Sequence, residues 1–249
     1  MPELPEVETT IRYLTSKVKE KKIISISKSQ KKLRKNLNFK DLESISQRKI
    51  ISVKRFAKYI VIRLDNDNYL IVHLGMSGRL KFYLNENYKK EKHDHVVLQF
   101  DKFKIVFNDP RRFGMFFRLE DVKEVEFFFN NYGTDLLVNK VKINEIYNKF
   151  ISKKVSLKQA LLNQSLIVGI GNIYANEALF HSRLSPLRLT NSLNLAELTQ
   201  LISSCKFVLK LSLKNGGSSI NDYKSPDGTL GSFQSLFKVC LLYTSPSPR

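Results

Sequence analysis

The sequence predicts an α+β protein in which a β-rich part precedes a helical part. Apolar residues recur at helical spacing over the first eighteen positions, and short β-branched and aromatic runs follow up to about residue 117. Helical spacing returns after residue 139. A chain of 249 residues can form one large domain or two smaller ones, each with its own core.

The first element is expected to be an amphipathic helix that begins near Pro5. Its apolar face is formed by Val7, Ile11, Leu14 and Val18. Pro5 suits a first helical turn, glutamates follow it at the positive end, and lysines 17 to 22 suit the negative end. Such a helix would hold Pro2 and Glu3 just before its N-terminus.

Short apolar runs between Lys22 and Phe117 are typical of β-strands. They are KYIVIRL, YLIVHLGM, RLKFYL, HVVLQF and FKIVF, with DNDN and DK as turns. This pattern predicts an antiparallel sandwich or barrel. In KYIVIRL only the face with Ile60, Ile62 and Leu64 is uniformly apolar, so the other face should look outward.

Four segments after residue 139 have helical spacing: INEIYNKFI, SLKQALLNQ, NIYANEALF and NLAELTQLISSCKFVLKLSL. Asn194 followed by Glu197 predicts a capping box, and NGG at 215–217 predicts the end of the last helix. A linker near residues 130–140 and a cleft between the two parts are expected.

Composition favours a soluble, cytoplasmic protein with a polyanionic partner. Lys and Arg number 42 against 23 Asp and Glu, a formal charge of +19, although a lysine-rich composition bias is the alternative. Cys205 and Cys240 are too few for a disulfide framework or a four-cysteine zinc ribbon. No apolar stretch approaches roughly 18 residues, and the N-terminus is no signal peptide, so no membrane association is expected.

The N-terminal MPE could supply a nucleophile. Removal of Met1 would leave Pro2 with a free secondary amine, and α-amino groups titrate near about 8, with the Glu3 carboxyl beside it. The alternative is that Pro2 only makes removal of Met1 efficient.

Two glycine-bounded motifs could act on a base stack. HLGMSGRL places Met76 at the end of a strand as an apolar wedge, or else in a tight turn with a buried methionine. NDPRRFGMF sets Arg111 and Phe113 on a loop that could insert the aromatic ring and hydrogen-bond the base left behind. The alternative is a solvated turn with the phenylalanine tucked beneath it.

The motif GIGNIYANE joins two helical patterns and begins the second with Asn172. Helix N-terminal amides attract phosphate, and an Asn there adds a side-chain donor. A close-packed helix joint with an ordinary Asn cap explains the glycines equally well. Lys58, in RFAKYIV, is by default a solvated strand lysine.

Taken in this order, the motifs resemble the formamidopyrimidine-DNA glycosylase family, bacterial repair enzymes for 8-oxoguanine and ring-opened purines. The similarity covers roughly residues 1–238 through MPELPEVET, AKY, HLGMSG, DPRRFG, ALLNQ, GIGNIYANE and GGSSINDYKSPDG. It implies a helix plus antiparallel β-sandwich domain at 1–130 and a helix-two-turn-helix DNA-binding domain at 131–217. A lesion-capping loop and the start of a zinc-finger region would follow at 218–239.

The resemblance implies a bifunctional glycosylase and lyase that bends DNA and flips the damaged nucleotide. The Pro2 nitrogen would attack C1′ and form a Schiff base, with Glu3 as general acid and base. β- and then δ-elimination would cut the strand, with Lys58 as proton donor and phosphate contact. No cofactor is needed for these steps.

The DNA-binding residues implied are His93, Lys158 and Asn172, together with the wedge of Met76, Arg111 and Phe113. Arg111 would face the orphaned cytosine, Asn172 would grip phosphate, and Lys158 would take part in recognising the damaged base. The lesion-capping loop would comprise Ser218, Ser219, Ile220, Asn221, Asp222 and Tyr223.

The sequence departs from the family after SFQSLFKV. There the family continues into a four-cysteine zinc ribbon whose hairpin supplies an arginine to the lesion phosphates, whereas this chain reads CLLYTSPSPR, with Cys240 alone. We expect a truncated ribbon without its structural zinc, a reading frame interrupted near Val239, and a disordered tail at 240–249. A lost phosphate contact costs roughly 1.5–3 kcal/mol, so weak activity is expected.

The expected partner is double-stranded DNA with oxidised purines or abasic sites, bound by a monomer. Two alternatives stay open. One is a relative of endonuclease VIII, which acts on oxidised pyrimidines; the leucine in MPELPEVET and the DPRRFG loop favour the purine enzyme. The other is a catalytically impaired DNA-binding protein, because the ribbon is missing.

Overall fold

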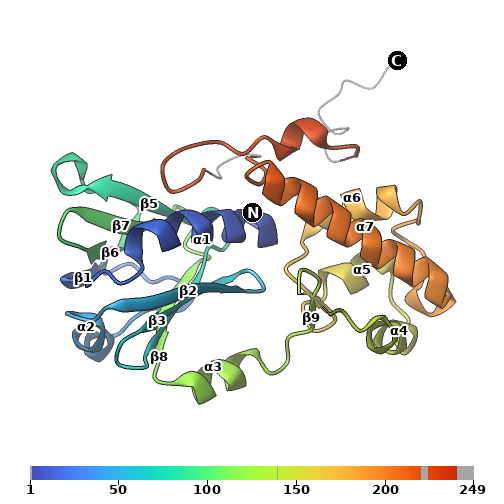
Figure 1. Ribbon diagram of the computed structural model, residues 1–249, viewed down its shortest axis with the longest axis horizontal. Helices are drawn as coiled ribbons and strands as arrows, with labels where there is room; N and C mark the ends of the chain where they lie inside the picture. The colour runs from blue at the N-terminus through green and yellow to red at the C-terminus, as the bar shows by residue number, and fades with distance from the viewer. Residues whose placement is uncertain (1, 139, 220–223, 240–249) are drawn as a thin grey trace. The chain divides into compact units, whose positions relative to one another are not determined.

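The computed structural model describes residues 2–138, 140–219 and 224–239 (Figure 1). Its contacts divide the chain into two compact units. The β unit contains residues 6–130 and 219–231 together with Pro2. The helical unit contains residues 131–218, residues 232 onward and residues 3–5.

Helix α1, Leu4–Val18, is the predicted amphipathic helix. All four apolar residues of its predicted face are at most 5% exposed and lie in the core of the β unit. Leu4, the first helical residue, is instead part of the core of the helical unit. The N-terminal segment therefore contributes to both cores.

The β unit contains two four-stranded antiparallel sheets. The first has the order β1 (Ser25–Lys28), β6 (Asp94–Gln99), β7 (Phe103–Asn108) and β5 (Arg79–Leu84). The second has the order β2 (Ile50–Phe56), β3 (Tyr59–Leu64), β4 (Tyr69–His73) and β8 (Met115–Leu119). Figure 1 shows both sheets with α1, and apolar residues from all three form one core, as a sandwich requires.

The burial of β3 follows the predicted alternation in part: the apolar face is buried as expected, but Tyr59, on the face expected to look outward, is also only 8% exposed. Ile60 and Ile62 pair with Val72 and Leu70 and are buried, whereas Arg63 is exposed. At the end of β4, His73 pairs with Met115 of β8. This pairing brings the turn after β4 beside the loop before β8.

Two helices in the β unit were not predicted: α2 (Phe39–Ile45) and α3 (Val122–Phe129). The predicted antiparallel sandwich is present, but the sequence analysis named no helix between residues 22 and 117, so α2 was missed. This short helix begins at a capping box in which the Asn38 side chain accepts from Asp41 N–H and the Asp41 carboxylate accepts from Asn38 N–H.

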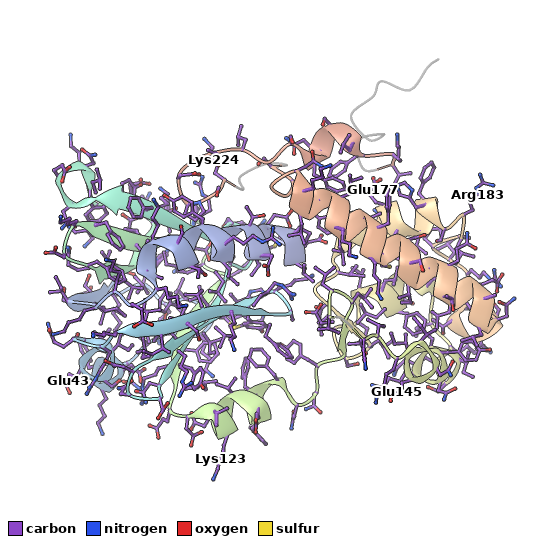
Figure 2. All side chains as sticks on the ribbon, in the orientation of Figure 1. Glu43, Lys123, Glu145, Glu177, Arg183 and Lys224 are labelled. Carbon is purple, nitrogen blue, oxygen red and sulfur yellow. The ribbon has the colours of Figure 1, made fainter. Side chains whose placement is uncertain are left out.

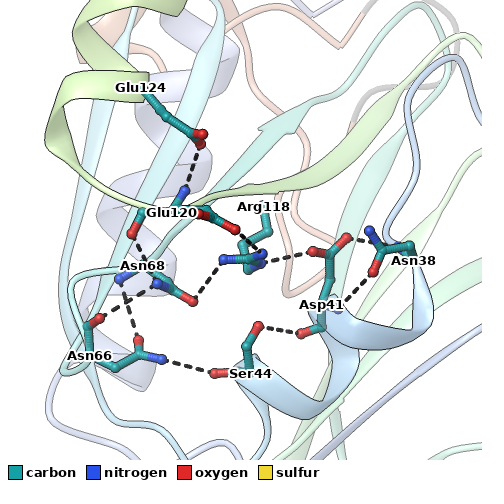
Figure 3. A network of polar contacts seen from close by, with 8 residues as sticks. All are labelled: Asn38, Asp41, Ser44, Asn66, Asn68, Arg118, Glu120 and Glu124. Carbon is teal, nitrogen blue, oxygen red and sulfur yellow. Dashed lines mark hydrogen bonds and ion pairs between the residues drawn. The ribbon is translucent and has the colours of Figure 1, made fainter.

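A polar network joins α2 to the second sheet (Figure 3). The Arg118 guanidinium donates to Asp41 Oδ1 at 2.8 Å, to Asn68 Oδ1 at 3.1 Å and to Glu120 Oε1 at 3.0 Å. The Arg118 and Asp41 side chains are only 14% and 9% exposed. The network therefore fixes a nearly buried charge pair with three hydrogen bonds.

We expect Arg118→Met to lower the free energy of unfolding by about 2 kcal/mol, because Asp41 would keep its buried charge without its cationic partner. Urea denaturation measures this loss. Arg63→Met is the matched control. Arg63 pairs with Asp67 at 2.6 Å, but their side chains are 47% and 71% exposed, so this pair should contribute little to stability. Equal losses for both variants would contradict the prediction.

The helical unit has four α-helices among its described residues: α4 (Ile143–Ile151), α5 (Leu157–Leu162), α6 (Asn172–His181) and α7 (Leu195–Lys214). All four were predicted, as were the Asn194–Glu197 capping box and the end of α7, where Gly216 and Gly217 adopt positive φ. A short parallel pair, β9 (Thr134–Asp135) and β10 (Ile167–Val168), was not. Short 3₁₀ turns occur at Asn85–Asn87, Thr190–Ser192 and Phe233–Leu236.

None of the helices in the described part of the chain has both the length and the apolar character needed to cross a lipid bilayer.

Candidate active site

The Glu3 carboxylate lies at the N-terminus of α6. It is 1% exposed, and it accepts hydrogen bonds from Gly171 N–H at 2.7 Å and from Ile173 N–H at 3.1 Å. Amides in the first turn of a helix lack intrahelical partners and form its positive end. This helix terminus therefore holds a buried carboxylate in a fixed position directly after Pro2.

The glycines of GIGNIYANE allow this approach. A Cβ on Gly171 would lie 2.4 Å from Glu3 Cδ and Oε1, and one on Gly169 would lie 2.4 Å from Leu4 Cδ1. Gln164, from the ALLNQ motif, accepts from Gly169 N–H at 2.9 Å and donates to the Ile170 carbonyl at 3.0 Å. The close-packed helix joint is thus observed, and Glu3 and Leu4 of the N-terminal segment pack against its glycines.

Asn172 is the first residue of α6, and its side chain is exposed. Gly171 occupies the N-cap position of α6, so the alternative in which Asn172 is an ordinary helix cap was wrong. Among the described residues, the Asn172 amide has no hydrogen bond within the protein, and its donors can bind a ligand. Lys158, the second residue of α5, is half-buried, and its backbone N–H donates to the Pro186 carbonyl at 3.2 Å.

Lys58 is not a strand residue, as its default interpretation had it. It occupies the two-residue turn between β2 and β3, after Ala57, which adopts φ +52°. It is half-buried, and its positive charge helps to lower the pKa of His73. Pro2, the predicted nucleophile, is buried.

The structure brings Met76, Arg111 and Phe113 together around a cavity of about 640 Å³ in the β unit. Met76 and Phe113 are 41% and 48% exposed, and the Arg111 guanidinium carbon lies 5.0 Å from the Phe113 ring centroid. The alternatives of a buried methionine and a tucked phenylalanine were therefore wrong. The other lining residues are Lys32, Leu33, Arg34, His73, Gly75 and Arg112.

A buried carboxylate, Asp109, fixes the loop that carries Arg111 and Phe113. Asp109 is 0% exposed and accepts from Ser77 Oγ at 2.6 Å and from Gly114 N–H at 2.8 Å. Ser77 Oγ in turn accepts from Arg111 N–H at 3.1 Å. The sequence interpretation did not single out Ser77 or Asp109, although an Asp before Pro110 is a turn signal that could have indicated it.

His73, also not singled out, is one of the residues that line this cavity. Its Nδ1 accepts from Gly75 N–H at 3.1 Å, and its ring packs against the Tyr59 ring with the two centroids 4.7 Å apart. Burial, followed by the charges of Lys58 and Arg34, lowers the pKa of His73 to about 4. The imidazole is therefore neutral at physiological pH and surrounded by cations.

Stability is expected to fall on acidification through His73. The folded-state pKa of about 4 lies below the ordinary 6.5, so the stabilisation is complete above pH 6.5 and is lost as the pH falls towards 4. For this partly exposed ring the loss should be about 2 kcal/mol. Urea denaturation of wild type and His73→Gln at both ends of this range measures it; parallel pH profiles would contradict the assignment.

The remaining predicted residues lie elsewhere. His93 does not line the cavity, but its carbonyl accepts from Asp109 N–H at 3.0 Å. Ser219 Oγ accepts from Gly231 N–H at 2.7 Å, and Ser218 is buried. Ile220, Asn221, Asp222 and Tyr223 lie outside the described residues, as do Cys240 and the predicted tail.

The cysteines of the chain do not fit a four-thiolate zinc site. Cys205 is 1% exposed in the core of the helical unit, and burial raises its pKa to about 12, which opposes the thiolate that zinc requires. Across the described residues, no three His, Cys, Asp or Glu side chains are placed to hold a metal ion.

The motif NIYANE ends in a second buried carboxylate, Glu177, labelled in Figure 2. It accepts from the backbone N–H groups of Lys238 at 2.9 Å and Val239 at 3.1 Å. Glu177 is therefore a structural anchor within the helical unit.

Known families match both parts of the chain. The family model for the formamidopyrimidine-DNA glycosylase N-terminal domain matches residues 1–116, and that for the H2TH domain matches residues 132–224. The formamidopyrimidine-DNA glycosylase of Wolbachia sp. subsp. Brugia malayi is 41% identical, and that of Zymomonas mobilis is 42% identical, each over 96% of this chain and 88% of the relative.

Solved structures give the same result. A Lactococcus lactis FPG mutant in complex with DNA that contains Fapy-dG has a TM-score of 0.87 at 29% identity, covering 94% of this chain and 86% of that one. MutM bound to DNA containing carbocyclic 8-oxo-G has a TM-score of 0.86 at 29% identity, with the same coverage. The antiparallel sheets, the helical unit, the family models and the curated relatives agree, and the chain belongs to the formamidopyrimidine-DNA glycosylase family.

Proposed function

We propose that this chain is a bifunctional DNA glycosylase and lyase of base-excision repair, acting as a monomer on oxidised purines in double-stranded DNA. The observation that carries the proposal is the buried Glu3 carboxylate, held by two helix amides directly after Pro2. The relatives named above, solved with Fapy-dG and 8-oxo-G in DNA, support the purine substrate class.

In the first step, the Pro2 nitrogen, freed by removal of Met1, attacks C1′ of the damaged nucleotide. The new N–C1′ bond replaces the glycosidic bond, and the base leaves with the bonding electrons and takes up a proton from water, while the Pro2 nitrogen gives up its own proton. Glu3 moves a proton at the sugar ring oxygen as the ring opens to an iminium ion. Its two fixed hydrogen bonds keep the carboxylate oriented without reorganisation during the reaction.

The iminium then drives strand cleavage. It acidifies the hydrogens on C2′, so β-elimination breaks the 3′ C–O bond and δ-elimination then breaks the 5′ C–O bond, and each departing strand keeps the phosphate at its new end. Lys58 is assigned as the proton donor for β-elimination and as a phosphate contact. Its position in a tight turn supports this role, because a turn fixes the start of a long side chain.

DNA binding rests on the charge of +19 and on the wedge residues. The exposed Met76 and Phe113 can fill the space left by the flipped nucleotide, while Arg111 faces the orphaned base. Asn172, with free donors at a helix N-terminus, grips phosphate. Lys158, His93 and the loop 218–223 keep their predicted roles in contacting DNA and covering the flipped base.

Borohydride trapping tests the function. The chain, with Met1 removal verified by mass spectrometry, is incubated with a duplex carrying one 8-oxoguanine opposite cytosine. We expect a reduced cross-link at the residue-2 amine that is absent in Pro2→Gly. No cross-link from folded, processed protein would leave only DNA binding, and trapping on oxidised pyrimidine alone would assign the chain to the endonuclease VIII type of activity.

A further inference from the structure

A basic arm, defined here as residues 31–35 (KKLRK), is joined through its backbone to the loop before β8. Arg34 N–H donates to the Gly114 carbonyl at 3.1 Å, and Phe116 N–H donates to the Lys35 carbonyl at 2.9 Å. Lys35 and Met115 form a parallel bridge. The arm is therefore held beside the loop that carries Arg111 and Phe113.

Side chains along the arm alternate in direction. Leu33 is 7% exposed and lies in the core, and the Lys35 ammonium lies 3.8 Å from the Phe117 ring centroid, where burial lowers its pKa. Lys32 and Arg34 are both exposed and line the cavity with Arg111 and Phe113. Two of the four cations of the arm thus face the cavity. Lys35 packs on Phe117, and Lys31 Nζ donates to the Lys92 carbonyl at 3.5 Å.

The cavity is strongly positive. Lys32, Arg34, Arg111 and Arg112 all line it, and within the described residues none of these four cations forms an ion pair with a carboxylate. Other basic residues of the same unit are paired, as Lys81 is with Glu91 at 2.7 Å. Uncompensated cations repel one another at close range, and an anion in the cavity removes this cost.

We propose that Lys32 and Arg34 bind backbone phosphates of the strand opposite the lesion. This assignment rests on the proposed function, in which Arg111 and Phe113 face the orphaned base. The arm shares their cavity, whereas Lys58, assigned to the lesion strand, does not line it. Lys32 and Arg34 therefore help the protein to bind duplex DNA in preference to a single strand.

The test measures equilibrium binding to a duplex with an uncleavable abasic-site analogue at several salt concentrations. Lys32→Gln and Arg34→Gln should each weaken binding roughly tenfold and reduce the slope of log K against log salt by about one. Binding to the single lesion-bearing strand should not change. Unchanged slopes, or equal losses on duplex and single strand, would overturn the proposal.

Two variants control for charge. Lys35→Gln removes a cation from the same arm, and Lys123→Gln removes one from α3, where Figure 2 shows the side chain directed away from the sheets. Both variants should keep the wild-type slope of log K against log salt. A decrease equal to that of Lys32→Gln and Arg34→Gln would mean that the overall positive charge, and not a phosphate contact, sets the slope. If borohydride trapping gives a cross-link but Lys32→Gln and Arg34→Gln leave the salt slope unchanged, only this inference is overturned. If the two variants reduce the salt slope on duplex DNA alone but trapping gives no cross-link, the catalytic proposal is overturned.

Discussion

Glu3→Gln should release 8-oxoguanine about 10²- to 10⁴-fold more slowly than wild type, the range that loss of a general acid or base produces. The amide occupies the same volume but cannot exchange a proton at the sugar oxygen. Its NH₂ group would also face an N–H of Gly171 or Ile173, where a carboxylate oxygen now accepts. Single-turnover base release on the 8-oxoguanine duplex measures the effect.

Gly171→Ala gives an independent check on Glu3. The added Cβ would fall 2.4 Å from the carboxylate, so Glu3 must move although it remains ionisable. We expect slower base release with duplex affinity retained. Thermal melting of both variants separates a catalytic loss from unfolding, and wild-type rates in either folded variant would exclude a positioned Glu3 from the reaction.

Asp109→Ala is expected to lower the free energy of unfolding by about 3 kcal/mol. Ser77 Oγ and Gly114 N–H would both lose the carboxylate that now accepts their hydrogen bonds, and Asp109 is fully buried. The loop with Arg111 and Phe113 would lose its anchor, so affinity for the lesion duplex should fall together with stability. Urea denaturation and equilibrium binding measure the two losses.

Asp101→Ala serves as the control for Asp109, because Asp101 is exposed in the turn between β6 and β7. Asp109→Asn should fall between wild type and alanine, since one amide oxygen replaces two acceptors. Full affinity in a destabilised Asp109→Ala chain would show that the loop keeps its conformation without the carboxylate.

Local patterns were sufficient to predict most of the fold. The 3.6-residue period gave α1 and the four helices of the helical unit, and alternation gave the buried face of β3. Helix α2 was missed, although its Asn38–Asp41 capping box is visible in the sequence, because it is seven residues long and lies among strands. The two-residue strands β9 and β10 are too short to show a period.

The candidate site was less predictable, because it depends on contacts between distant residues. Met76, Arg111 and Phe113 were found by their motifs, but only the His73–Met115 pairing brings them to one cavity. The hydrogen bonds of Glu3 to Gly171 and Ile173 have no local signature at all. Lys58 was placed on a strand because nothing in the sequence reveals that Ala57 adopts positive φ.

The sequence separation of Glu3 and its partners has a consequence during protein synthesis. Gly171 follows Glu3 by 168 positions. At roughly 5–20 residues per second, a ribosome needs about 10 to 30 s to reach it. During this interval the site around Glu3 cannot form, and the N-terminus stays accessible to a methionine-removing enzyme. Pro2 is buried once the chain has folded, so its amine is best released while the ribosome is still translating.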